Sequence, residues 1–172
     1  MDKKENKDEV KKYFNPEEYV TKIVGPTDDS DKDDIFEDKV SAIVSLLTDP
    51  ENKELKEETL LTLKKEKAGD LIITAISNLK AKPKKHILVA ACWESEINFS
   101  DKLPFFINLA LDTDYLVSLE AITVIENMEG PFNISDVSEA IKKVKAFQKS
   151  ITNEKAVLLN DLVIKLESFL KD

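Results

Sequence analysis

Apolar residues recur three and four positions apart through almost the whole chain from residue 34, and this spacing constrains the fold more than any other feature. An α-helix places such residues on one side, whereas a half-buried strand requires alternation, and no convincing alternating pattern occurs. The clearest stripe consists of Val137, Ile141, Val144 and Ile151, with Ala140 and Phe147 beside it. The chain also has only three glycines and six prolines, too few for the many tight turns of an all-β fold. The sequence therefore predicts an all-α protein.

We expect eight helices in this region, each bounded by polar or turn-forming residues. Their ranges are about 34–48, 52–66, 69–79, 83–95, 101–111, 114–128, 135–150 and 153–171. Ser100 is the expected N-cap of the fifth helix, and Pro104 falls in a first turn that tolerates it. Alternate helices start about 33 residues apart, which pairs the helices into hairpins. Because one hairpin cannot bury its own apolar face, we expect a short right-handed α-solenoid of about four antiparallel helical hairpins.

Residues 1–33 differ from the rest, because they are rich in charge and poor in apolar side chains. Such a composition does not offset the entropy of ordering, so we expect a mobile segment before a folded domain at 34–172. A short helix around residues 10–24, ended by Gly25-Pro26, is one alternative for part of it. The segment is either a solvated leader or an arm that binds a partner.

The charge balance limits the kinds of partner. The formal net charge is −9, and no arginine occurs among the 25 basic residues. An acidic chain without arginine is poorly suited to neutralise phosphates, so we expect no nucleic acid partner. The longest apolar run, Ile87 to Trp93, has seven residues, far fewer than the roughly 20 that cross a bilayer. With one cysteine and no apolar stretch of signal-peptide length at the N-terminus, the sequence predicts a cytoplasmic monomer that does not bind membranes.

His86 and Cys92 raise the question of a nucleophilic site. Six residues apart on one continuous helix, they project about 120° from each other and lie about 9 Å apart along its axis, which excludes a catalytic dyad. Cys92 lies within the apolar run Ile87–Trp93, which predicts a helix buried on all sides and an inert thiol, whereas His86 is expected to be exposed. One cysteine and one histidine do not make a zinc site. We therefore expect no enzyme, no catalytic residue, no metal and no cofactor.

A binding surface is predicted on the helix at 114–128. Its core stripe is expected to contain Val117, Ala121, Val124, Ile125 and Met128. Tyr115, Leu119, Thr123 and Glu126 then point away from the core, and Glu94 and Glu96 interrupt a neighbouring apolar segment. These six residues form a candidate partner site with an apolar centre and an acidic rim. The alternative is that Tyr115 and Leu119 pack against a neighbouring repeat.

One motif carries a resemblance to a known family. The pattern Asp114-x-x-Val117-Ser118-x-x-Ala121 resembles the start of the second helix in HEAT repeats, and Leu55-Lys56-x-x-Thr59 after Asp49-Pro50 is a looser match. Residues 90–128 are also similar to uncharacterised bacterial HEAT-like proteins, and the resemblance extends over about residues 34–150.

The HEAT resemblance implies a scaffold that binds other proteins and has no catalytic residues. A non-enzymatic adaptor is therefore the leading hypothesis. Two alternatives stay open. One is a small carboxylate-dependent hydrolase or glycosylase on a helical-repeat scaffold, since carboxylates are plentiful. The other is self-assembly through an uncapped end of the repeat.

Overall fold

A computed structural model describes residues 15–25, 32–51, 53–78, 84–112, 114–151 and 154–171. Within these ranges the chain contains nine α-helices, one short 3₁₀ helix and no strand. The helices are α2 (Pro16–Val24), α3 (Lys32–Thr48), α4 (Lys53–Lys65), α5 (Gly69–Asn78), α6 (Lys85–Glu94), η2 (Ser100–Lys102), α7 (Leu103–Asp112), α8 (Tyr115–Glu126), α9 (Ile134–Gln148) and α10 (Lys155–Ser168). The all-α prediction is confirmed, and the eight expected ranges correspond to α3 to α10. Among the described residues, none of these helices is long and apolar enough to cross a membrane.

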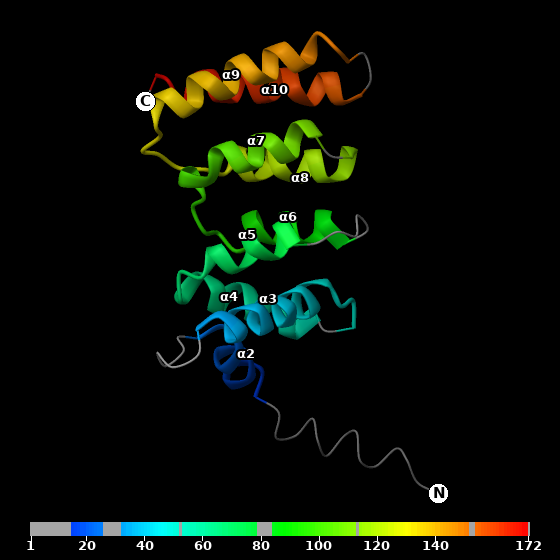
Figure 1. Cartoon of the computed structure of the whole chain (residues 1–172), viewed down its shortest axis with the longest axis vertical. Coiled ribbons are helices and arrows are strands. Elements are labelled where there is room, and N and C mark those ends of the chain that lie inside the picture. The colour runs from blue at the N-terminus through cyan, green and yellow to red at the C-terminus, as the bar shows by residue number, and fades with distance from the viewer. Residues whose placement is uncertain are drawn as a thin grey trace, which may run out of the picture. The chain divides into compact units, whose positions relative to one another are not determined.

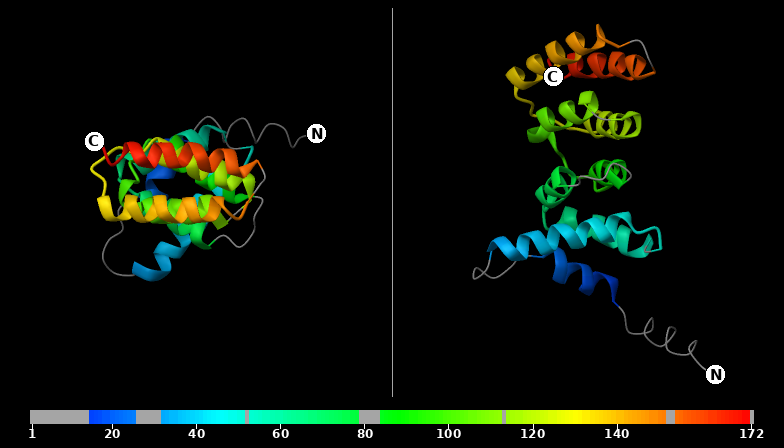
Figure 2. Two further views of the ribbon diagram at one scale, coloured as in Figure 1. Left: turned by 90° about the horizontal axis from the view of Figure 1, so that it is seen from above. Right: turned by 45° about the vertical axis from the view of Figure 1, so that its right-hand side comes forward.

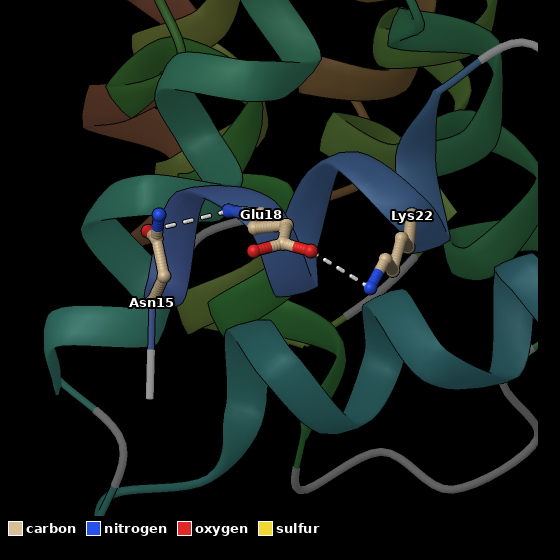
Figure 3. A network of polar contacts seen from close by, with 3 residues as sticks. All are labelled: Asn15, Glu18 and Lys22. Atoms are coloured by element: carbon tan, nitrogen blue, oxygen red, sulfur yellow. Dashed lines mark hydrogen bonds and ion pairs between the residues drawn. The ribbon is translucent and has the colours of Figure 1, made fainter. Parts of the chain in front are cut away.

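The chain divides into two compact units, residues 1–75 and 76–172, with α5 running over the boundary. In the first unit, α2 packs on α3 and α4, and its Val20 and Val24 are buried. Asn15 begins α2, because its side chain accepts a hydrogen bond from the Glu18 amide at 3.4 Å, and Glu18 pairs with Lys22 at 2.9 Å (Figure 3). Part of the segment expected to be mobile is therefore a docked helix, whereas residues 1–14 and 26–31 lie outside the described ranges.

The second unit consists of two layers of helices (Figures 1 and 2). The hairpin α7/α8 packs against the hairpin α9/α10, with α7 beside α9 in one layer and α8 beside α10 in the other. α6 extends the second layer, because it packs along the side of α8. Stacking of hairpins is thus present within this unit. The handedness of the stack and its continuation through the first unit stay predictions.

The start of α7 differs from the prediction. Ser100 is not an N-cap; it is the first residue of η2, and α7 begins at Leu103. The reason is that Asn98 accepts a hydrogen bond from the Ser100 amide at 3.2 Å, while Phe99 between them is buried and contacts the Phe106 ring edge-to-face. The chain therefore turns as a 3₁₀ helix over Ser100–Lys102, and α7 begins two residues later than predicted. Pro104 does lie in the first turn of α7.

A buried lysine joins the two hairpins of the second unit. Lys155, at the start of α10, is only 8% exposed, and its ammonium donates a hydrogen bond to the Leu111 carbonyl at 2.9 Å. Leu111 lies in the last turn of α7, where carbonyl groups lack helical partners and attract cations. The same ammonium lies 5.5 Å from the centre of the Phe147 ring of α9. One cation therefore contacts both α7 and α9 from α10.

Lys155→Met should lower the free energy of unfolding by about 1–3 kcal/mol, because the side chain keeps most of its length while the buried Leu111 carbonyl loses its donor. Lys142→Met, at an exposed position of α9, is the control and should change the value by less than about 0.5 kcal/mol. Urea denaturation followed by circular dichroism measures both. Equal effects of the two substitutions would contradict a structural role for the Lys155 ammonium.

Candidate functional site

α8 is the central helix of the second unit, in contact with α6, α7 and α10. Asp114 begins the helix, because its carboxylate accepts a hydrogen bond from the Val117 amide at 3.0 Å. All five expected core residues, Val117, Ala121, Val124, Ile125 and Met128, are buried, and so are Ser118 and Ile122. Three neighbouring helices thus cover most of α8 and leave one stripe of it in contact with solvent.

The structure places the predicted site residues in two groups. Tyr115, Leu119, Thr123 and Glu126 share the uncovered side of α8: Tyr115 and Glu126 are exposed, and Leu119 and Thr123 are half-buried. The Thr123 hydroxyl donates to the Leu119 carbonyl at 3.1 Å, so it is satisfied within the helix.

The two remaining residues of the predicted site, Glu94 and Glu96, lie at the end of α6. Glu94 is the last residue of that helix and is half-buried. Glu96 lies beyond it, exposed, with a left-handed φ of 53° that ends the helix. Because α6 packs on α8, both carboxylates belong to the layer that contains the α8 stripe.

The prediction that the apolar run Ile87–Trp93 is buried on all sides is wrong at Trp93. The segment Ile87–Trp93 is not buried on all sides: Leu88, Val89, Ala91 and Cys92 are buried, but Trp93 is 38% exposed. Its indole N–H donates a hydrogen bond to the Glu120 carboxylate of α8 at 2.9 Å. This bond crosses from one helix to the next and holds the ring in place at the surface.

Two further residues of α8 were missing from the predicted set. Leu116 is 52% exposed, and Glu120 receives the indole bond. Leu116 lies seven residues before Thr123 and four before Glu120, so helical spacing alone could have placed all three on one side. No such signal existed for Trp93, whose position depends on a contact 27 residues away.

We call this region the α6/α8 surface. We define it by the uncovered side chains Trp93, Tyr115, Leu116, Leu119 and Thr123, together with the carboxylates of Glu94, Glu120 and Glu126 on the same two helices. The sequence of α8 contains two glutamates and no basic residue. The surface therefore combines large apolar side chains with negative charge alone along α8.

Cys92 and His86 do not form a site. The Cys92 thiol is fully buried and contacts the Leu88 carbonyl at 3.6 Å within its own helix. Burial raises the pKa of Cys92 well above its ordinary value, so the thiol is protonated and unreactive at neutral pH. His86 is half-buried in the first turn of α6 rather than exposed. Across the described ranges, no three histidine, cysteine, aspartate or glutamate side chains are grouped so that they could hold a metal ion.

Comparisons with protein-family models, with curated proteins and with solved structures found no match to this chain. The HEAT-like resemblance therefore stays a prediction that rests on the motifs around residues 49–59 and 90–128.

Cys92 should make the stability of the protein fall as the pH rises above about 8.5. The unfolded thiol ionises near that pH, whereas the folded thiol with its raised pKa stays protonated, so the unfolded state binds fewer protons. The free energy of unfolding should fall by up to about 1.4 kcal/mol per pH unit more than in a Cys92→Ala variant, which lacks the thiol. Denaturation of both proteins between about pH 8 and 10 measures the two slopes. Parallel slopes would show that the thiol ionises equally in both states.

Proposed function

We propose that the protein is a non-enzymatic adaptor that binds another protein through the α6/α8 surface. The observation that supports this most directly is Trp93, a large aromatic ring that is partly exposed and fixed by Glu120 from the adjacent helix. Tryptophan is enriched among the residues that dominate binding energy, and a ring already held in one orientation loses little entropy when a partner covers it.

Two further large side chains of the surface are exposed on α8. Leu116 and Tyr115 are 52% and 42% exposed on the uncovered stripe of α8. Exposed apolar side chains gathered on one face of a soluble protein indicate an interaction site more strongly than scattered ones do. The partner segment proposed here carries apolar side chains for Trp93 and Leu116.

The negative charge of the α6/α8 surface favours some partner segments over others. Glu94, Glu120 and Glu126 belong to the surface, and α8 carries no positive charge of its own. Opposite charge on the partner speeds encounter and disfavours acidic competitors, although a rim charge adds little affinity. The proposed partner segment therefore has lysine or arginine beside its apolar side chains. The hydrolase and self-assembly alternatives stay untested predictions.

Leu116→Asp should abolish recovery of the partner from the source cell, because it replaces an exposed apolar side chain of the surface with a charged one. The loss should be at least about 30-fold in affinity, the value of one dominant interface residue. Since the side chain is exposed, the helical circular dichroism spectrum and the unfolding midpoint should hardly change. Affinity purification with crosslinking and mass spectrometry identifies the partner.

Ile164→Asp is the matched control, because Ile164 is a 61% exposed apolar residue on α10, in the same unit but outside the α6/α8 surface. It should leave partner recovery unchanged. Equal recovery with Leu116→Asp and the unmodified protein would refute the proposed surface, and loss with Ile164→Asp alone would move the contact to α10.

A further inference from the structure

A concave region lies in the other layer of the 76–172 unit, between α7 and α9. It is a groove of about 180 Å³, lined by Pro104, Ile107, Asn108, Asp136, Glu139, Ala140 and Lys143. Pro104, Ile107 and Ala140 supply an apolar floor. Asn108, Glu139 and Lys143 form an exposed rim, so that the groove opens to solvent.

Two charged side chains of the groove, Glu139 and Lys143, do not form the ion pair that their spacing in the sequence suggests. Glu139 and Lys143 are four residues apart on α9, the spacing of a helical ion pair. Lys143 instead donates a hydrogen bond across the groove to the side-chain oxygen of Asn108 on α7. Among the described residues, no ion pair joins Glu139 to Lys143, and none is formed by Asp136 one turn earlier. The carboxylates of Asp136 and Glu139 therefore lie beside an apolar floor and outside any ion pair of the described residues, while the one cation that lines the groove, Lys143, is bonded to Asn108.

The size of the groove limits what it can hold. A cavity of about 150 Å³ accommodates a benzene ring, whereas sites for drug-sized ligands measure about 300–1,000 Å³. The groove thus has room for one long side chain but not for most of a small-molecule ligand. Lysine and arginine combine an apolar stem with a cationic end, which matches an apolar floor beside two carboxylates.

We propose that the α7/α9 groove binds a single arginine or lysine side chain presented by a segment of a partner protein. The stem lies on Pro104, Ile107 and Ala140, and the cationic group donates hydrogen bonds to Asp136 and Glu139. Because α7 and α9 form the layer that does not contain α6 and α8, this site is separate from the α6/α8 surface. The unit can therefore bind two protein segments at once.

The test is an NMR titration of the full chain, at low salt, with the blocked peptide acetyl-Ala-Leu-Arg-Leu-Ala-amide. Its control is the same peptide with citrulline in place of arginine, which keeps the shape and removes the charge. The arginine peptide should shift the backbone amide signals of residues 105–108 and 136–143, and the citrulline peptide should shift them much less. Equal shifts with both peptides would overturn the proposal. Equal or tighter binding of spermidine would do so too, since the groove would then hold a free small cation.

Two protein variants sharpen the test. The double variant Asp136→Asn, Glu139→Gln should weaken the arginine peptide at least about tenfold, because it removes both charged acceptors. Lys143→Gln keeps an amide donor for Asn108 and removes the competing positive charge, so binding should tighten about two- to fivefold. Both substitutions are on the surface, and circular dichroism should confirm an unchanged helical content. Unchanged peptide binding by the double variant would overturn the proposal.

As a control on the other layer, Asp161→Asn, at an exposed position of α10, should leave the peptide shifts at the groove unchanged. If Asp161→Asn weakened them as much as the double variant does, the peptide would be responding to net negative charge rather than to this groove, which would also overturn the proposal.

Discussion

The burial of α8 determines most of what the 76–172 unit presents to solvent. Each of the helices α6, α7 and α10 packs against α8, and seven residues from Val117 to Met128 are buried. A helix covered on three sides retains a single uncovered stripe, and in α8 this stripe carries Tyr115 and Leu116. The position of the α6/α8 surface is thus a consequence of core packing, and the surface is as rigid as the helices that form it.

Contacts between residues that lie far apart in the sequence fix several local details of this unit. The Trp93 indole is held by Glu120, and the Asn98 side chain joins the α6–η2 loop to the α8–α9 loop through hydrogen bonds with the Glu129 backbone at 2.6 and 3.2 Å. At the next hairpin, the ion pair between Lys145 and Glu167 spans α9 and α10 at 2.6 Å, and the hydrogen bond from Lys145 lowers the pKa of Glu167. Each interaction is local in space and distant in sequence.

That distinction explains what the sequence could and could not predict. Helix positions and the core stripe of α8 were predicted correctly, because each helix buries its own periodic set of side chains. Ser100 was assigned wrongly as an N-cap, since the burial of Phe99 against Phe106 determines where the chain turns. Trp93 was predicted to lie in the core, because an apolar run in the sequence does not reveal which side of the helix lacks a neighbouring helix. Leu116, by contrast, could have been found from its spacing to Thr123.

Trp93 is the only tryptophan in the chain, so its fluorescence reports directly on whether a partner protein covers the uncovered side of α6 and α8. The decisive measurement is acrylamide quenching of Trp93 fluorescence in the free protein and in complex with the partner that Leu116→Asp fails to recover, using a partner fragment without tryptophan. We expect measurable quenching in the free protein, where the ring is 38% exposed, and a clear loss of quenching in the complex. Unchanged quenching at saturating partner would show that binding occurs elsewhere.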